Sequence, residues 1–598
     1  MPADLITIDT ATPVLGVAAS ANGRRWMWRQ SDARIGLAIA QRLALPELLG
    51  TLLSARGVGI EQAQDFLEPT LRALMPDPST LIDMDAAAER LAHAVRHGEQ
   101  VAVFGDYDVD GACSAALITR FLRELGCSVR AYVPDRLKEG YGPNPAAIAA
   151  LCEEGATLIV CVDCGIAAHA ALEAARGLAD VVVLDHHKAE GPVPVVAAAV
   201  NPNRLDCTSG LRHLCAAAVA FMAAVATLRV LRQAGHFGAS TPPDLRGLLD
   251  LVALATVCDV MPLTGLNRAL VTQGLKVMGR GDRPGIAALL EVAQARDAPS
   301  AYTLGFLLGP RINASGRIGE PDLGVRLLTC DDPIEARVMA ERLDAVNRRR
   351  QEVEAEVLGS AFAEAERQAA LGQPVLLIVG EGWHPGVVGI VAGRVKERFN
   401  RPACVAGLQD GLAKGSGRSV PGVDLGAAII AARQMGLLET GGGHAMAAGF
   451  SFRPERQAEV QAFLAERLAH AADLPGAADL LLDASLMVPA ATPELAEQVA
   501  RLGPFGAGND EPVFVLPRAR ISRADRVGRE GGTVRAFLTG EGGGRLKAVC
   551  FRAKAGPLAE LLLNSNGAPV HLAGALRAER WNGETSASLH VQDAAPAS

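Results

Sequence analysis

Three aspartates stand at alternating positions where an apolar stretch of the chain ends. Val101–Phe104 predicts a buried strand, Asp106, Asp108 and Asp110 follow it, and a helix pattern begins at Ala112. Carboxylates this close repel one another and raise one another's pKa, a cost that a nearby cation removes. Hard divalent ions such as Mg²⁺ and Mn²⁺ bind carboxylate oxygens. The stretch therefore favours a metal site over a solvated acidic turn.

Further candidate ligands follow later apolar runs of the same region. Asp163, the triplet Asp185-His186-His187 and Asp259 each come directly after such a run. Taken singly, an aspartate at this position is more often a helix cap, and a histidine is more often a satisfied core residue. Their recurrence favours one shared site. Two ions about 3.5–4 Å apart in such a site can activate a water and stabilise the leaving oxygen of an in-line displacement.

Short apolar strands alternate with helices around these residues, which predicts an α/β domain with a mostly parallel, doubly wound sheet. Such sheets bind ligands at the carboxyl ends of their strands, where the candidate ligands stand. We expect Asp83 to cap the first helix and Gly98 to end it. The expected strands are 101–104, 128–133, 157–162 and 180–184, and the expected helices are 84–97, 112–125, 145–154 and 167–176.

The composition is that of a protein with several domains and no membrane-spanning segment. The chain has 598 residues, of which 49% are hydrophobic and 21% are charged, as in ordinary globular proteins. The longest apolar run, Leu214–Leu228, is too short to span a bilayer and predicts a buried helix. Eleven scattered cysteines, many inside apolar runs, indicate reduced thiols. We therefore expect a cytoplasmic protein that does not associate with membranes.

The formal net charge of −8 does not favour nucleic-acid binding, but the charge is unevenly distributed. Residues 518–554 carry ten Lys and Arg against three acidic residues, a local charge of +7. Five short β-prone stretches between 513 and 591 resemble an OB-fold, a barrel that binds single strands with a basic groove and aromatic side chains. A generic β-barrel interaction module is the alternative. The candidate aromatic residues are Phe505, Phe514, Phe537, Phe551 and Trp581.

The acidic and histidine motifs, taken in order, resemble those of the DHH phosphoesterase superfamily. These motifs are Asp108–Gly111, Asp163–Gly165, Asp185–His187 and Asp259. The resemblance implies two Mn²⁺ or Mg²⁺ ions, with Asp163 or Asp259 as the bridging carboxylate. It also implies that His187 contacts the scissile phosphate and that Asp163 and His187 are catalytic. The implied metal ligands are Asp108, Asp110, Asp163, His186 and Asp259.

The chain departs from the superfamily at one position. Small-substrate members commonly carry a histidine four residues before the first motif aspartate, and here that residue is Phe104. Asp106 is therefore kept as an additional candidate ligand.

Three features follow the ligand motifs. Gly309–Arg317 mixes polar and small residues, which favours a phosphate or sugar contact over an ordinary surface loop. An unbroken helix pattern over 331–371 predicts a connecting helix. The motifs WHPGVVGIVAGR, SGRS and GGGHAMAAG over roughly 371–455 resemble the DHH-associated domain, a second α/β domain that binds the distal parts of the substrate. The glycine run before His444 also suggests an anion-binding nest.

The complete order of motifs resembles the RecJ family of single-strand-specific exonucleases. This resemblance implies 5′→3′ release of 5′-mononucleotides from single-stranded DNA, in recombination and repair. Single-strand-binding protein and a helicase become candidate partners, and a monomer is expected. The implied 5′-phosphate anchors are Arg311, Ser416 and Arg418, and the further substrate contacts are Asn313, His384 and His444.

The resulting prediction divides the chain into six parts. They are a helical extension (1–75), the DHH domain (76–330), the connecting helix (331–370), the DHH-associated domain (371–455), a helix and linker (456–489), and the OB-like barrel (490–598). Two other functions stay open at this point: a DHH hydrolase of short oligonucleotides or cyclic dinucleotides, and a single-strand-binding repair scaffold with a vestigial metal site.

Overall fold

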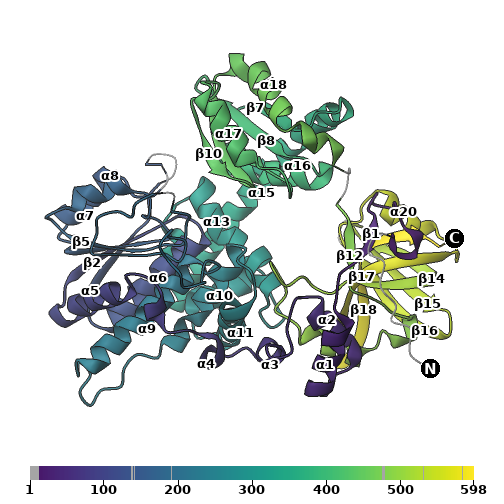
Figure 1. Ribbon diagram of the computed structural model, residues 1–598, viewed down its shortest axis with the longest axis horizontal. Helices are drawn as coiled ribbons and strands as arrows, with labels where there is room; N and C mark the ends of the chain where they lie inside the picture. Colours follow the sequence, from purple (N-terminus) through teal and green to yellow (C-terminus); the bar gives the residue numbers. More distant parts are fainter. Residues whose placement is uncertain are drawn as a thin grey trace. The chain divides into compact units, whose positions relative to one another are not determined.

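The computed structural model describes residues 12–135, 139–140, 142–189, 191–474, 478–528, 531–581 and 583–597 (Figure 1). The chain forms two compact units. The first unit contains Gln62–Arg350 and Gly503–Asp510, and the second contains the described parts of Met1–Glu61, Gln351–Leu502 and Glu511–Ser598. All candidate metal ligands belong to the first unit.

A five-stranded parallel sheet with the order β3-β2-β4-β5-β6 lies at the centre of the first unit. The predicted parallel, doubly wound sheet is therefore confirmed. The chain leaves β2 toward β3 and then returns to the other side of β2 to form β4. Open α/β sheets bind ligands at such a reversal point, here the carboxyl ends of β2 and β4. The strands are β2 (Gln100–Gly105), β3 (Ser128–Tyr132), β4 (Leu158–Val162), β5 (Asp180–Leu184) and β6 (Ala198–Val200).

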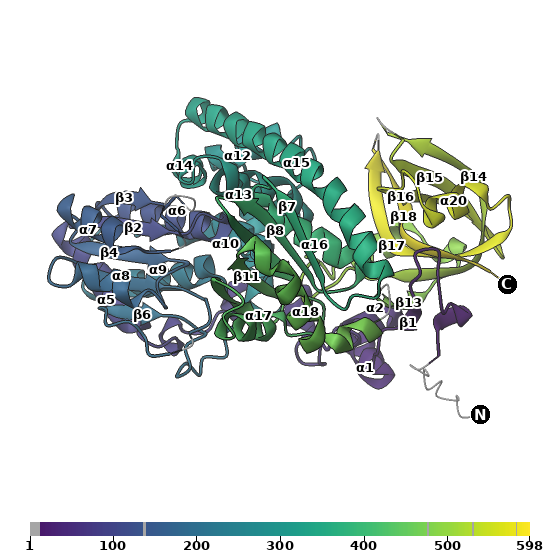
Figure 2. The ribbon, with the colours of Figure 1, turned by 90° about the horizontal axis from the view of Figure 1, so that it is seen from above.

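Helices cover both faces of this sheet (Figures 1 and 2). Side chains alternate along a strand, so Val101 and Val103 of β2 pack into a core with α5, α6 and α9, while Ala102 and Phe104 pack on the other face with α7 and α8. Both faces are buried, which explains the continuous apolar runs of the strands. The helices are α5 (Met84–His97), α6 (Val109–Glu124), α7 (Pro145–Glu153), α8 (His169–Leu172) and α9 (Ala216–Gln233).

Helix α9 is the buried helix predicted from the apolar run at 214–228. Within the described residues it is the one helix long and apolar enough to cross a membrane, and 72% of it is buried inside the protein. A core helix passes the same test, so this finding is weak evidence for a membrane span. All eleven cysteines lie in the described part of the chain and are free thiols.

The ends of α5 and α6 differ in part from the predictions. Gly98 ends α5 in the left-handed region (φ 61°), as expected. Asp83 precedes α5, but within the described structure its carboxylate makes no capping hydrogen bond, because it accepts from the buried Arg204 guanidinium (2.6 Å) instead. Helix α6 begins at Val109, three residues earlier than predicted, since Asp108 caps it. Asp110 is therefore a helical residue.

The rest of the first unit is helical. The segment Gly309–Arg317, considered as a possible surface loop, is helix α13, and the long helix expected over 331–371 is α15. The helices are α10 (Leu249–Cys258), α11 (Gly265–Met278), α12 (Pro284–Val292), the π-helix η5 (Thr303–Leu308), α13 (Gly309–Ile318), α14 (Leu323–Thr329) and α15 (Pro333–Ala370), whose end continues into the second unit.

The second unit contains a mixed sheet with the order β10-β11-β9-β8-β7, in which only β7 and β8 are parallel. The predicted glycine nest before His444 is wrong, because Gly441–Gly443 lie within strand β10. A Cβ at Gly441 would lie 3.0 Å from Ile429 of α17, so this glycine allows close packing. The elements are β7 (Leu376–Glu381), α16 (Pro385–Phe399), β8 (Ala403–Gln409), β9 (Leu412–Arg418), α17 (Leu425–Gln434), β10 (Thr440–His444), β11 (Ala447–Phe452) and α18 (Gln457–Arg467).

A closed barrel forms the C-terminal part of the second unit, as predicted. Its strands pair in the order β14-β15-β16-β18-β17, and β17 pairs back to β14. A helix, α20, connects β16 to β17. The strands are longer than the predicted stretches. The elements are β13 (Ala484–Ser485), β14 (Phe514–Val527), β15 (Thr533–Gly540), β16 (Gly543–Cys550), α20 (Pro557–Asn564), β17 (Pro569–Trp581) and β18 (Glu584–Pro596).

The N-terminal extension is not only helical. Strand β1 (Trp26–Trp28) pairs in parallel with β12 (Leu480–Leu482). The Trp26 indole N–H donates to Asp593 of the barrel (3.0 Å), and its ring is fully buried. The described residues before α3 thus belong to the second unit. Four short helices complete the extension: α1 (Ala33–Leu43), α2 (Glu47–Ser54), α3 (Ala63–Leu67) and α4 (Leu71–Leu74).

Candidate metal centre

The first three candidate ligands lie in the turn between β2 and α6. The Asp108 carboxylate accepts a hydrogen bond from the Gly111 backbone N–H (3.0 Å). A Cβ at Gly111 would lie 2.4 Å from the backbone oxygen of Asp106, so glycine is required for the helix to start this close to the strand. Asp106 and Asp110 are buried. The turn therefore gathers three carboxylates at the carboxyl end of the central strand.

Asp163 stands at the end of the neighbouring strand β4. Its backbone is in the left-handed region (φ 58°), a conformation that costs a non-glycine residue about 1–3 kcal/mol and recurs at functional sites. Its backbone N–H donates to the carbonyl of Leu184 (3.1 Å), which holds the strained turn against β5. The carboxylate is 1% exposed.

Asp185 orients the two histidines that follow β5. Its Oδ1 accepts from the backbone N–H groups of His186 (2.7 Å) and His187 (3.1 Å) and lies 2.8 Å from His187 Nδ1. Asn203 donates to the carbonyl of His186 (2.6 Å), and Asn201 donates to that of His187 (2.8 Å). Asn201 and Asn203 were not predicted as site residues, and Asp185 was part of a predicted motif without a role of its own. The signal was present in the sequence, since Asp185 opens the triplet and Asn-Pro-Asn follows β6.

The remaining ligands come from helix ends. Asp110 accepts hydrogen bonds from the first backbone N–H groups of α9, those of Ala216 (2.7 Å) and Ala217 (2.8 Å). Asp259 is the residue that ends α10, so the expectation that the ends of the sheet strands gather all the ligands is wrong for this residue. The negative end of the α10 dipole adds to the unfavourable environment of its carboxylate.

These side chains converge on one point. His186 Nε2 lies 3.3 Å from Asp163 Oδ1, 3.5 Å from Asp259 Oδ2 and 3.7 Å from Asp110 Oδ2. Three groups have ligand atoms within 4.8 Å of one another, and the groups share members. We call their union the acidic cluster. The groups are Asp106, Asp108 and Asp163; Asp110, His186 and Asp259; and Asp163, His186 and His187.

The electrostatics of the acidic cluster are unfavourable without a cation. Burial, and then the charges of Asp110 and Asp108, raise the pKa of Asp163 well above its ordinary value. The same causes raise the pKa of Asp259 to about 8. The pair of Asp185 and His187 behaves differently. Burial alone would lower the pKa of His187, but the Asp185 carboxylate raises it to about 9, so this imidazole is charged at neutral pH.

The cluster fits a divalent ion. Among the described residues, no hydrogen-bond donor reaches the buried oxygens Asp163 Oδ1 and Asp259 Oδ2. Buried polar atoms are normally satisfied, and here the unsatisfied atoms are carboxylate oxygens that face one imidazole nitrogen. Carboxylates with an imidazole are ligands that Mg²⁺ and Mn²⁺ accept. Phe104 is buried in the core beneath the sheet, and Asp106 instead joins Asp108 and Asp163.

Comparison with known proteins agrees with this geometry. Residues 100–256 match the model of the DHH family N-terminal domain, 372–470 match the DHHA1 domain, and 482–593 match the RecJ OB domain. The single-stranded-DNA-specific exonuclease RecJ of Dickeya dadantii is 39% identical over 92% of this chain and 96% of its own length. The Escherichia coli protein of the same name is 41% identical over 79% of this chain and 83% of its own length. The chain belongs to the RecJ family.

Solved structures of RecJ proteins contain the ions that the cluster would take. The crystal structure of RecJ from Thermus thermophilus in complex with Mn²⁺ has a TM-score of 0.77 at 30% identity and covers 95% of this chain and 79% of that chain. The complex of the same protein with Mg²⁺ has a TM-score of 0.71 at 28% identity, with 95% and 78% coverage. As a member of the RecJ family, this chain therefore has the fold of a metal-dependent exonuclease over nearly its whole length.

Two substrate contacts expected from the RecJ resemblance have structural partners in the first unit. Arg311 forms an ion pair with Asp344 of α15 (2.9 Å) and donates to the carbonyl of Leu307 (2.6 Å). The Asn313 side-chain oxygen accepts from the backbone N–H of Val109 (3.2 Å). In this structure Asn313 therefore supports the turn that carries Asp108 and Asp110.

The other expected contacts belong to the second unit. Arg418 donates to the Ser416 hydroxyl (2.8 Å) on strand β9, and Gly389 of α16 leaves room beside both side chains. His384 caps α16 by accepting from the Gly386 N–H (3.0 Å), and His444 is exposed at the end of β10. Ser416 and Arg418 form a pair of donors, whereas His384 has a structural role.

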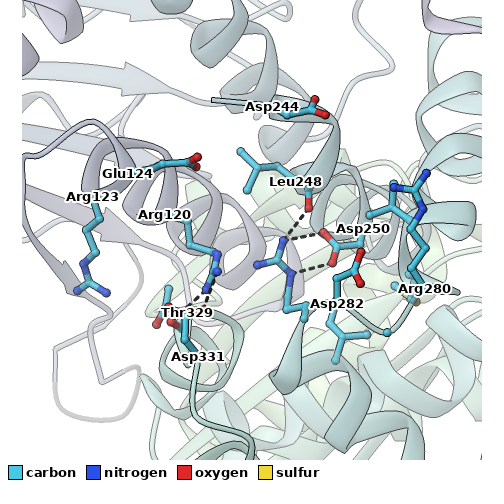
Figure 3. Close-up of a pocket in the computed structure, with 16 residues that line it drawn as sticks. Arg120, Arg123, Glu124, Asp244, Leu248, Asp250, Arg280, Asp282, Thr329 and Asp331 are labelled. Atoms are coloured by element: carbon cyan, nitrogen blue, oxygen red, sulfur yellow. Dashed lines mark hydrogen bonds and ion pairs between the residues drawn. The ribbon is translucent and has the colours of Figure 1, made fainter. Parts of the chain in front are cut away.

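A cavity of about 580 Å³ elsewhere in the first unit contains none of the predicted site residues. Two of its four arginines are paired with other residues of the wall. Arg120 contacts Thr329 and Asp331, and the buried Arg283 forms an ion pair with Asp250 (2.7 Å) (Figure 3). The walls carry four arginines and five acidic residues, so the cavity has no large excess of one charge with which to select a ligand.

Proposed function

We propose that this chain is a 5′→3′ exonuclease that hydrolyses single-stranded DNA with two divalent ions and releases 5′-mononucleotides in DNA recombination and repair. The observation that carries the proposal is the acidic cluster, with its two unsatisfied buried oxygens, in a chain of the RecJ family. The basic barrel favours a polymeric single strand over a short oligonucleotide or cyclic dinucleotide.

The residues of the acidic cluster take separate parts in this proposal. Asp106, Asp108, Asp110, Asp163, His186 and Asp259 would hold two ions, with Asp163 or Asp259 between them. When bound, these ions activate the attacking water and stabilise the leaving oxygen. The ring of His187, held by Asp185, is a hydrogen-bond donor to the scissile phosphate. The strained backbone of Asp163 keeps its carboxylate aimed at the cluster.

The direction of degradation would come from the second unit. We propose that Ser416 and Arg418 bind the 5′-phosphate, because a hydroxyl and a guanidinium side by side match its oxygens. Binding of the 5′ end at these donors would set the polarity of degradation. We propose Arg311 of the first unit and His444, exposed at the end of β10 in the second unit, as further contacts to the DNA.

The partners and location follow the same proposal. We place the protein in the cytoplasm as a monomer, where a helicase unwinds DNA and a single-strand-binding protein covers the released strand. The free thiols of all eleven cysteines support a reducing compartment.

One experiment tests the activity. Single-stranded DNA labelled at either end is incubated with the protein and Mn²⁺, and the products are sized. We expect label at the 5′ end to appear first, as mononucleotide, while EDTA abolishes the reaction. The Asp163→Ala variant should bind the strand without cutting it, and Asp297→Ala, an exposed aspartate of the same unit, should cut normally. Loss of the 3′ label first, or cutting without metal, would refute the proposal.

A further inference from the structure

Tyr302 and Phe306 form an exposed aromatic pair on the first unit. Their ring centroids are 5.0 Å apart with an interplanar angle of 24°, and the residues are 56% and 63% exposed. Aromatic residues make up only 4% of the chain. Among the described residues, the other exposed large aromatic side chains are Phe537 and Phe551 of the barrel. A stacked pair of rings left in water is an unusual surface feature and indicates a contact with a partner molecule.

The aromatic pair belongs to a helix that packs beside one half of the acidic cluster. Tyr302 precedes η5 and Phe306 lies within it, and η5 continues directly into α13. On the buried side, a Cβ at Gly309 would lie 2.5 Å from the sulfur of Cys258 at the end of α10. Phe306 therefore lies one helical turn before Gly309, which packs against Cys258, the residue that precedes Asp259.

The same helix reaches the other half of the acidic cluster. Asn313 accepts from the Val109 N–H, and a Cβ at Gly316 would lie 2.7 Å from the ring of Tyr107. Phe306 lies seven residues before Asn313, which is at most about 10 Å along the helix at the α-helical rise of about 1.5 Å per residue. A stacked strand rises about 3.4 Å per nucleotide. A phosphate at the acidic cluster would thus have the aromatic pair within a few nucleotides.

We infer that Tyr302 and Phe306 form a stacking platform for unpaired bases of the DNA strand, a few nucleotides from the scissile phosphate. This inference rests on the proposed function. Every base has a π-face, so stacking tolerates any sequence. In a duplex both faces of an internal base are already stacked, while the phosphates that the acidic cluster contacts are the same in both forms. The platform would therefore favour single-stranded over double-stranded DNA at a point close to the metal centre.

The test compares variants of Phe306 on two substrates. One is a 5′-phosphorylated oligothymidylate, and the other has abasic sites at its first six positions from the 5′ end. With Mn²⁺, Phe306→Ala should raise KM on the normal strand about 5- to 150-fold, the effect of losing one stacked base. Phe306→Leu should behave like Phe306→Ala, because leucine is apolar without a flat face. Phe306→Tyr should restore the wild-type KM.

The abasic strand separates stacking from other effects. On it, the wild type and Phe306→Ala should have the same KM. Leu178→Ala, at an exposed apolar residue of the same unit (64% exposed), should match the wild type on both strands. A wild-type KM for Phe306→Leu, or an equal loss on both strands, overturns the platform and indicates an apolar contact with a protein surface. An active wild type with unaffected Phe306 variants refutes only the platform, whereas a wild type that leaves the strand intact refutes the proposed function.

Discussion

Replacing Asp259 by asparagine should stabilise the metal-free protein while removing its response to Mn²⁺. The pKa of Asp259 is about 8 in the folded protein, against about 3.9 in an unfolded chain. The folded state therefore binds the proton more tightly, so stability is lost as the pH rises from about 4 to about 8. Asparagine stays neutral without taking up a proton, and its amide N–H groups can donate to the neighbouring carboxylate of Asp110.

The magnitude follows from the pKa difference. Stability falls by about 1.4 kcal/mol per pH unit above the unfolded pKa of about 3.9, so keeping Asp259 protonated in the folded state lowers the free energy of unfolding at pH 7 by at most about 4 kcal/mol. The side chain is 25% exposed and relaxation reduces the effect, so we expect a gain of about 1–3 kcal/mol for Asp259→Asn. For a domain of this size that corresponds to a rise in Tm of roughly 2–10 °C.

Thermal unfolding in EDTA at pH 5, 7 and 8 measures this effect. The difference in Tm between Asp259→Asn and the wild type should increase with pH. Added Mn²⁺ should raise the Tm of the wild type, since a bound ion stabilises only the folded state, and should raise that of the variant much less. Asp297→Asn is the matched control on an exposed carboxylate. A lower Tm for Asp259→Asn in EDTA, or a difference that does not change with pH, would refute the argument that the acidic cluster stores electrostatic repulsion.

Three further predictions concern catalysis and binding. Asp185→Asn should lower the pKa of His187 from about 9, so kcat should begin to fall at a lower pH than in the wild type; an unchanged pH profile would exclude a charged His187. Arg418→Ala should raise KM for 5′-phosphorylated DNA at least tenfold but change KM little for DNA with a 5′-hydroxyl, and an equal effect on both would count against the anchor. Arg545→Ala with Arg552→Ala, both exposed on the barrel, should reduce the slope of log affinity against log salt by about 0.7 per lost phosphate contact; an unchanged slope would place the DNA elsewhere.

The parallel sheet and most of the cluster could be predicted because both depend on local sequence signals. Buried strands are continuous apolar runs, and residues at their carboxyl ends meet at one edge of the sheet. Asp106, Asp108, Asp163 and His186 follow this rule. The barrel could be predicted for a similar reason, because five β-prone stretches separated by turn residues are compatible with few architectures other than a barrel.

Other parts of the site depend on contacts between distant residues. Asp259 follows an apolar run that is a helix, and a short apolar run alone does not distinguish a buried helix from a strand. Gly309–Arg317 has poor helix propensity, yet it is helical because Gly316 and Asn313 pack against Tyr107 and Val109, two hundred residues earlier. The aromatic candidates of the barrel divide in the same way: Phe514 is buried, Phe537 and Phe551 are exposed, and the side chain of Trp581 lies outside the described part of the chain.

The segment Gly503–Asn509 shows how such a distant contact changes the design of an experiment. By sequence position it belongs with the barrel, but it is part of the first unit. The carbonyl of Ala507 accepts from the Leu263 N–H (2.7 Å), and the buried Arg268 donates to the carbonyl of Gly503. The segment therefore covers the loop that begins at Asp259. Deleting 490–598 would remove this segment together with the barrel. A loss of activity in that truncated protein could therefore come from the exposed loop at Asp259 and would not show that the barrel binds DNA. Substitution of the exposed barrel arginines leaves the cover in place and separates the two effects.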